Sequence, residues 1–153
     1  MRYAVTLIQA LVLVMLMLPF TVWAEANWME NYQQALFVAK DQGKPLLLDF
    51  TGSDWCHWCI KLEKEVFSQP EFADYAAGNL VLVRVDFPKW QEQSEELVEQ
   101  NEDLARKFRV RGFPTVVLLD PDGNKIATTG YQESDAAAYV EHLKRILAGR
   151  TGH

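Results

Sequence analysis

Cysteine is scarce in this chain of 153 residues, which contains only Cys56 and Cys59, separated by two residues. An exported domain that depended on disulfides for stability would carry several of them and would close longer loops than this one. With no third cysteine in the chain, the pair has no other partner. We therefore interpret the pair as functional.

Basic residues and histidines are also few. The chain has 15 Lys and Arg against 21 Asp and Glu, and a net charge of −6, which argues against nucleic acid as a partner. A closed zinc site needs two ligands besides the cysteines, and the only histidines are His57, His142 and His153. Covalent haem would require a histidine in the place of Ile60. We expect neither a metal nor a cofactor.

The amino-terminal segment has the features of an export signal. Arg2 supplies a positive charge, residues 10–18 are apolar, and small residues precede a polar stretch at Ala24. We expect residues 1–24 to be a signal peptide that is cleaved after Ala24. No cysteine stands near this point, so a lipid-modified amino terminus is not expected.

An alternative is that the signal is kept. The apolar stretch at residues 4–23 is close to the ~20 residues that a bilayer requires, so it would serve as a membrane anchor. In either case residues 25–153 have the length of one domain. Cleavage and release into the periplasm, or another export compartment, is the simpler expectation.

Hydrophobic periodicity divides the rest of the chain into helices and strands. Helices are expected at residues 28–39, 56–67, 70–79, 94–108 and 136–147, and strands at 46–50, 80–87, 115–119 and 125–129. The last two strands flank a turn at residues 120–124 and should form a hairpin. This order predicts an α/β fold that combines parallel crossover units with an antiparallel hairpin.

The sequence Cys56-His57-Trp58-Cys59 follows a buried strand and a turn-rich loop, at the start of a helix. The first sulfur of such a motif lies at the helix amino terminus, where unpaired N–H groups favour a thiolate. Cys56 is therefore the expected nucleophile, and Cys59, one turn further in, is the expected resolving thiol. The spacing is equally that of half a zinc site, so the motif alone does not decide.

A second motif gives the decision. Gly112-Phe113-Pro114-Thr115 leads into a strand, where a cis-proline bond can be held. Together with Trp55-Cys56-His57-Trp58-Cys59, it resembles the W-C-x-x-C and G-x-P-T motifs of the thioredoxin family. The resemblance covers residues 28–148 and implies a thioredoxin fold, a three-layer α/β/α structure with a central mixed sheet and Pro114 beside the sulfurs.

The resemblance also implies roles for neighbouring residues. The Phe113 backbone beside Pro114 would pair with an extended substrate segment, and Trp55 would provide an apolar contact. His57 departs from the family, since thioredoxins with Gly-Pro between the cysteines have no ionisable group there. We expect His57 and Trp58 to tune the redox properties, because a protonated histidine there stabilises a thiolate; the alternative is a solvent-facing histidine that barely affects either sulfur.

Two further features concern the kind of thioredoxin. Asp49 resembles the buried proton acceptor of thioredoxins, although six residues separate it from Cys56, one more than is usual. The segments Phe50–Cys56 and Val85–Pro88 resemble small periplasmic reductases of the DsbH type.

These features favour a monomeric thiol:disulfide oxidoreductase that reduces disulfides in exported proteins and is itself kept reduced by a membrane electron donor. The mature chain leaves no room for a separate dimerisation domain. The same residues would also suit a disulfide isomerase or an oxidase. A non-catalytic module that binds thiols or a metal through Cys56 and Cys59 is the alternative from another class.

Overall fold

The computed structural model describes residues 25–149. The expected signal peptide at residues 1–24, its cleavage after Ala24 and the alternative anchor at residues 4–23 all lie outside the described residues. Within residues 25–149, no helix combines the length and the apolar character needed to cross a membrane.

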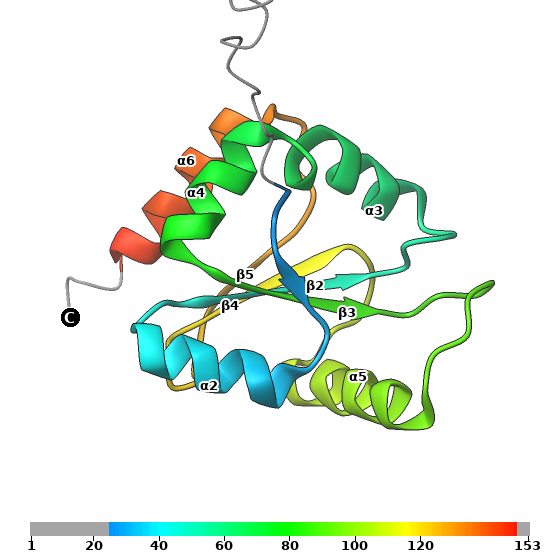
Figure 1. The fold of residues 1–153 in the computed structure, drawn as a ribbon. Helices are drawn as coiled ribbons and strands as arrows, with labels where there is room; N and C mark the ends of the chain where they lie inside the picture. Colours follow the sequence, from blue (N-terminus) through cyan, green and yellow to red (C-terminus); the bar gives the residue numbers. More distant parts are fainter. Residues whose placement is uncertain (1–24, 150–153) are drawn as a thin grey trace, which may run out of the picture.

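A mixed sheet forms the middle layer of the molecule (Figure 1). Its strands are β1 (Trp28–Met29), β2 (Leu46–Thr51), β3 (Val81–Asp86), β4 (Thr115–Leu119) and β5 (Lys125–Thr129), and their order is β1-β3-β2-β4-β5. β3 runs parallel to β1 and β2, whereas β4 runs antiparallel to β2 and β5. The predicted crossover units and the terminal hairpin are therefore confirmed.

Helices cover both faces of this sheet (Figure 1). One face carries α2 (Tyr32–Gln42) and α5 (Glu95–Phe108). The other carries α3 (His57–Leu62), a π-helical turn η1 (Glu63–Phe67), α4 (Pro70–Asn79) and α6 (Ala136–Ala148). The expected three-layer α/β/α arrangement with a central mixed sheet is thus confirmed.

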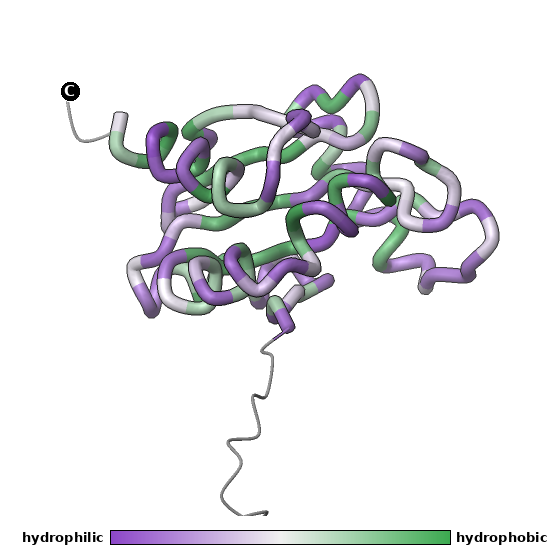
Figure 2. The backbone as a smooth tube through the Cα atoms, turned by 90° about the horizontal axis from the view of Figure 1, so that it is seen from above, coloured by the Kyte–Doolittle hydropathy of each residue, from purple (hydrophilic) through white to green (hydrophobic). Residues whose placement is uncertain are grey.

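Side chains of β2 alternate between two hydrophobic cores, because successive residues of a strand point to opposite faces. Leu46, Leu48 and Phe50 pack with α2 and α5, and Leu47 packs with α3 and α6. All six residues of β2 are buried. In Figure 2, where the backbone is coloured by residue hydropathy, hydrophobic segments run through the middle of the molecule. By the same alternation, Asp49 lies on the face that α3 covers.

The single helix predicted over residues 28–39 is wrong at its first turn. Trp28 and Met29 form β1 beside β3, and α2 begins only at Tyr32. Asn31 caps this helix by accepting a hydrogen bond from the Gln34 amide at 2.8 Å. Trp28 instead packs against two phenylalanine rings of the opposite core, which explains why an apolar residue stands there.

Asn101 interrupts the apolar face of α5 for a structural reason. Its side chain is buried and donates a hydrogen bond to the Asp86 carbonyl at 2.9 Å, at the end of β3. The helix itself matches the prediction, since it spans Glu95–Phe108 with Ser94 as its cap. α6 begins at Ala136, as expected, and Asp135 is its cap.

Candidate functional site

Cys56 and Cys59 form a disulfide at the amino terminus of α3, with their Cα atoms 5.2 Å apart. Cys56 is the N-cap residue, with extended backbone angles (φ −82°, ψ 107°), and its Sγ accepts a hydrogen bond from the Cys59 amide at 3.3 Å. Cys56 is 7% exposed and Cys59 only 3%. The two sulfurs therefore differ in environment: among the described residues, the sulfur of Cys56 accepts an amide of the helix end and that of Cys59 does not.

The loop before the cysteines is fixed to the loop that follows β3. The Gly52 carbonyl accepts the amides of Trp55 and Cys56, at 3.2 and 2.8 Å, which closes a turn. Ser53 donates its amide and its hydroxyl to the two carboxylate oxygens of Asp86, at 2.9 and 2.5 Å. This turn lies within the six-residue segment between Asp49 and Cys56.

Asp54 adds a second connection between these loops. Its carboxylate accepts the backbone amides of Lys89 at 2.9 Å and of Trp90 at 2.7 Å. The segments that follow β2 and β3 are therefore held together at the carboxyl ends of these strands, next to the disulfide. The sequence did not single out this role: Asp54 stands in the segment that resembles DsbH-type reductases, but nothing there indicated its partners at Lys89 and Trp90.

Trp55 is fixed by polar and aromatic contacts. Its Nε1 donates to the Phe87 carbonyl at 2.8 Å, and its ring meets that of Phe113 edge-on at 6.0 Å. Phe113 in turn stacks on Phe87 at 5.0 Å. Because 38% of Trp55 is exposed, the three rings form a partly accessible apolar shelf beside Cys56.

The proline singled out in the sequence follows this shelf. The peptide bond between Phe113 and Pro114 is cis. The Thr115 hydroxyl donates to the Gly112 carbonyl at 2.7 Å and so closes the loop that precedes β4. Since Phe113 contacts Trp55, the structure brings the two sequence motifs together.

Asp49 is buried on the α3 side of the sheet and is 3% exposed. Burial raises the pKa of its carboxyl to about 7; Arg84 acts in the opposite direction, and Glu63 adds to the increase. Among the described residues, no donor is hydrogen-bonded to its Oδ1. A carboxyl that titrates near neutral pH can accept or release a proton during a reaction.

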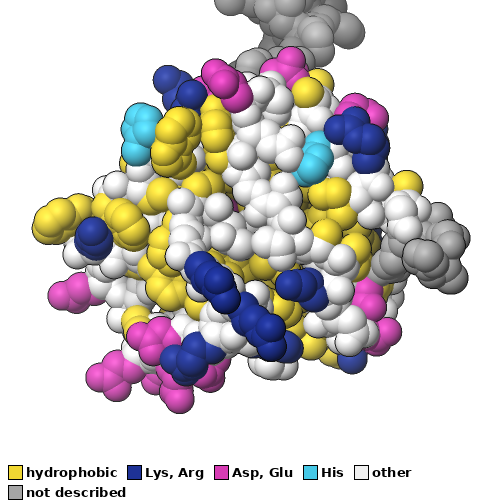
Figure 3. All heavy atoms as spheres, turned by 180° about the vertical axis from the view of Figure 1, so that it is seen from behind, with side chains coloured by type: hydrophobic (Ala, Val, Ile, Leu, Met, Phe, Trp, Pro, Cys, Tyr) yellow, Lys and Arg dark blue, Asp and Glu magenta, His cyan; other side chains and the backbone are white. Residues whose placement is uncertain are grey.

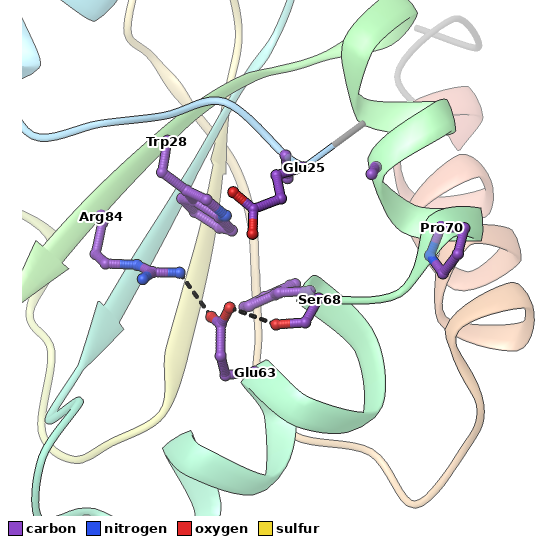
Figure 4. A pocket seen from close by; sticks show the side chains of 9 residues that line it. Glu25, Trp28, Glu63, Ser68, Pro70 and Arg84 are labelled. Carbon is purple, nitrogen blue, oxygen red and sulfur yellow. Dashed lines mark hydrogen bonds and ion pairs between the residues drawn. The ribbon is translucent and has the colours of Figure 1, made fainter. Parts of the chain in front are cut away.

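Glu63 and Arg84, whose charges act on Asp49, form an ion pair with each other. Arg84 donates to Glu63 at 2.6 Å, and Ser68 donates to the other oxygen of Glu63 at 2.8 Å. Figure 4 shows Glu63 between these two partners, in a pocket of about 600 Å³ that Trp28 also lines. A second pocket, of about 370 Å³, reaches from this pair to Cys59.

Trp58 belongs to a cluster that the sequence did not reveal. It is 51% exposed, and its ring lies 5.2 Å from that of Tyr131, in the loop before α6. The Lys61 ammonium lies over both rings, at 5.4 and 5.2 Å. Tyr131 donates its hydroxyl to Glu65 at 2.8 Å. Tyr131 is 73 residues from Trp58 along the chain, so no local pattern relates the two.

His57 is exposed, and its ring meets that of Trp58 edge-on at 5.4 Å. Its position beside Cys56 is therefore as expected, but its expected effect on the sulfurs stays a prediction. His142 lies elsewhere, where its Nε2 contacts Thr129 and Gln132 at 2.9 and 2.8 Å. Within residues 25–149, no three His, Cys, Asp or Glu side chains gather in a way that could hold a metal ion.

Comparisons with known proteins agree with this geometry. The family model of the thioredoxin-like domain matches residues 32–145. The disulfide bond reductase DsbH of Chlamydia pneumoniae is 40% identical over 124 residues, which are 81% of this chain and 74% of that protein. The thiol:disulfide interchange protein DsbD of Vibrio vulnificus is 35% identical over 120 residues, but the match covers only 18% of its length.

Solved structures lead to the same result. A DsbH oxidoreductase superposes with a TM-score of 0.80 at 37% identity, over 87% of this chain and 92% of that one. A thioredoxin from Thermus thermophilus superposes with a TM-score of 0.60 over 80% of this chain and 88% of its own, at 21% identity, which shows the fold alone. The predicted thioredoxin fold and the resemblance to the DsbH type are both confirmed.

Proposed function

This chain belongs to the thioredoxin-like family and is a thiol:disulfide oxidoreductase, and we propose that it is an exported, monomeric reductase of protein disulfides. One observation carries the proposal. Cys56 caps a helix with an amide on its sulfur, while Cys59 is more deeply buried behind it. This arrangement favours a thiolate at Cys56 as the attacking group and leaves Cys59 as the resolving thiol.

The reaction begins with the reduced dithiol. The Cys56 thiolate attacks one sulfur of a substrate disulfide, a new S–S bond forms to Cys56, and the other substrate sulfur leaves as a thiolate. The departing thiolate takes a proton from solvent. The product of this step is a mixed disulfide between Cys56 and the substrate.

The second step releases the substrate. Cys59 gives its proton to the Asp49 carboxylate and attacks the Cys56 sulfur, so that the mixed disulfide breaks and the second substrate sulfur leaves as a thiolate. This thiolate then takes up the proton held by Asp49 or one from solvent. The substrate has then gained two electrons and two protons, and the enzyme holds the Cys56–Cys59 disulfide. A pKa of about 7 for Asp49 suits this proton acceptor, because the group is basic enough to accept a proton and is still partly ionised at neutral pH.

The shelf beside Cys56 holds the substrate. An extended segment pairs with the Phe113 backbone next to Pro114, in the manner of an added strand, and lies against Trp55. His57 and Trp58 adjust the stability of the Cys56 thiolate from the other side. In its protonated form, His57 stabilises this thiolate and makes the disulfide more oxidising.

A reductase needs a source of electrons. We propose a membrane electron donor that reduces the Cys56–Cys59 disulfide after each cycle. The support is indirect: relatives of this chain include a protein named disulfide bond reductase and proteins named thiol:disulfide interchange protein. The proposed location rests on the sequence of residues 1–24, which has the features of an export signal.

Equilibration of the mature protein with glutathione buffers, followed by insulin reduction, tests the proposal. We expect turnover of insulin and a potential near the value of about −270 mV that is typical of thioredoxin. A potential near the value of about −120 mV typical of DsbA would contradict a reductase and indicate an oxidase. If the protein exchanges with neither oxidised glutathione nor insulin, it is instead a module without turnover. Size-exclusion chromatography with light scattering tests the monomer.

A further inference from the structure

Two tryptophans flank the cysteine pair, and each carries a lysine ammonium over its ring. The Lys89 Nζ lies 4.0 Å from the ring centroid of Trp55, and the Lys61 Nζ lies 5.4 Å from that of Trp58. Lys89 comes from the loop after β3 and Lys61 from α3, so they approach the disulfide from different elements. Positive charge is therefore present on both sides of the reactive sulfurs.

Arg111 adds a third positive charge at this end of the sheet, where β4 begins beside the carboxyl end of β2. It is exposed and lies in the loop that leads to Phe113 and Pro114. Three Cα–Cα steps separate Arg111 from Pro114, so the two Cα atoms are within about 11 Å of each other. Figure 3 shows the rear face of the molecule, where several Lys and Arg side chains lie close together and others lie beside hydrophobic or acidic side chains.

These charges are only partly neutralised. Within residues 25–149, neither Lys89 nor Arg111 forms an ion pair with a carboxylate. Lys61 has two acidic neighbours, Glu65 at 3.8 Å and Glu133. The chain as a whole has a net charge of −6, so the basic groups beside the disulfide are opposite in sign to the overall charge. Carboxylates of a bound substrate can supply the missing partners.

We infer that Lys61, Lys89 and Arg111 form a basic rim that selects disulfides whose neighbouring residues carry carboxylates. The inference rests on the proposed function and specifies its substrate class, namely acidic segments of exported proteins. A rim of this kind acts mainly on the rate of association, because opposite charges steer the encounter and fix its orientation. An anionic membrane surface is the less fitting occupant, since contact through these residues would cover the cysteines.

Stopped-flow reduction of synthetic disulfide peptides tests the rim in the reduced mature protein. Three peptides share one sequence around the disulfide and carry flanking glutamates, glutamines or lysines. At low salt, we expect the second-order rate constant for the acidic peptide to exceed that for the neutral peptide by about three- to tenfold, and the basic peptide to be slowest. The difference should shrink in 0.5 M salt, because the Debye length becomes shorter there.

A charge-removing variant and its matched control complete the test. In Lys89→Gln/Arg111→Gln, the ratio of the acidic to the neutral rate constant should fall to near one. Lys40→Gln/Lys125→Gln loses the same charge at the last turn of α2 and the start of β5, and its ratio should stay close to that of the unmodified protein. Using a ratio cancels any change in the reactivity of Cys56 itself.

The outcomes separate the two proposals. If all peptides are reduced at equal rates, the basic rim is wrong while the reductase stands. If no peptide is reduced, the proposed function fails. Vesicles of phosphatidylglycerol provide the remaining arm: binding that is lost in Lys89→Gln/Arg111→Gln, with no preference among the peptides, would overturn the inference in favour of a lipid surface.

Discussion

The amide of Cys59 donates a hydrogen bond to the sulfur of Cys56 across 3.3 Å, so the sulfur occupies the place of an oxygen in a helix N-cap. This contact distinguishes the two cysteines in a way that their spacing cannot. A negative charge on the Cys56 sulfur is stabilised by the amide and by the helix end. Cys59 is buried within the first turn and receives no such contact among the described residues.

The first prediction concerns covalent trapping. Cys59→Ala leaves the attacking thiol but removes the resolving one, so mixed disulfides with substrates should accumulate on Cys56. Cys56→Ala should trap none, since Cys59 is only 3% exposed. Non-reducing electrophoresis after acid quenching, followed by mass spectrometry of the adducts, measures both. Equal trapping by the two variants would contradict the assigned roles.

The second prediction is a pH dependence of stability that arises from Asp49. Burial raises the pKa of Asp49 to about 7 in the folded protein, against about 4 in an unfolded chain. Between these values the folded state holds a proton that the unfolded state has lost, so the free energy of unfolding falls as pH rises from about 4 to about 7. The full loss is about 4 kcal/mol and is complete above the folded pKa.

Asp49→Asn is the matched variant, because an amide of the same shape does not titrate. Urea unfolding of the oxidised protein at pH 4 to 8 should show that its stability relative to the unmodified protein increases with pH. The same variant should slow release of the mixed disulfide above pH 7, where the unmodified protein has an ionised acceptor. A constant difference in stability across this range would show that Asp49 keeps an ordinary pKa.

The third prediction concerns Glu63, which is not part of any sequence motif. Its negative charge raises the pKa of Asp49, and its ion pair engages Arg84, whose positive charge lowers that pKa. Glu63→Gln removes the first effect and frees Arg84, so the pKa of Asp49 should fall below about 7. Glu71→Gln, at an exposed position of α4, provides a control with the same loss of charge. Carboxyl carbon chemical shifts across a pH titration measure both variants, and an unchanged pKa in Glu63→Gln would exclude the coupling.

Strands and helices with a regular hydrophobic pattern could be predicted from the sequence. Apolar runs located β2 to β4, because a strand between two helical layers must bury both faces. The turn at residues 120–124 located β5, which is an edge strand and only partly buried. Trp28 was misread, since a helical spacing of apolar residues does not reveal that the first of them packs against Phe67 and Phe72. Only the tertiary contact distinguishes a two-residue strand from a helical turn.

Some residues of the candidate site could likewise be found from the sequence and others could not. Cys56, Cys59 and Pro114 stand in short motifs, so the sequence located them. Arg84 is brought to the site by β3 and Tyr131 by the loop before α6. Both are residue types that commonly stand at exposed positions, so the sequence did not single them out. Their contribution depends on partners far away along the chain, which a single sequence does not identify.

The last prediction tests how the loop holds the site. A Cβ atom at Gly52 would lie 2.5 Å from Cε2 and 2.6 Å from Nε1 of Trp55, so Gly52→Ala must displace the indole and break its 2.8 Å bond to the Phe87 carbonyl. We expect a loss of about 1–3 kcal/mol in the free energy of unfolding and a change in tryptophan fluorescence. Gly78→Ala, where the Cβ meets nothing within 4 Å in α4, should instead stabilise by about 0.5–1 kcal/mol. In a Trp55→Phe background the smaller ring leaves room, so Gly52→Ala should be less destabilising there; an equal loss in both backgrounds would show that the indole is not the obstacle.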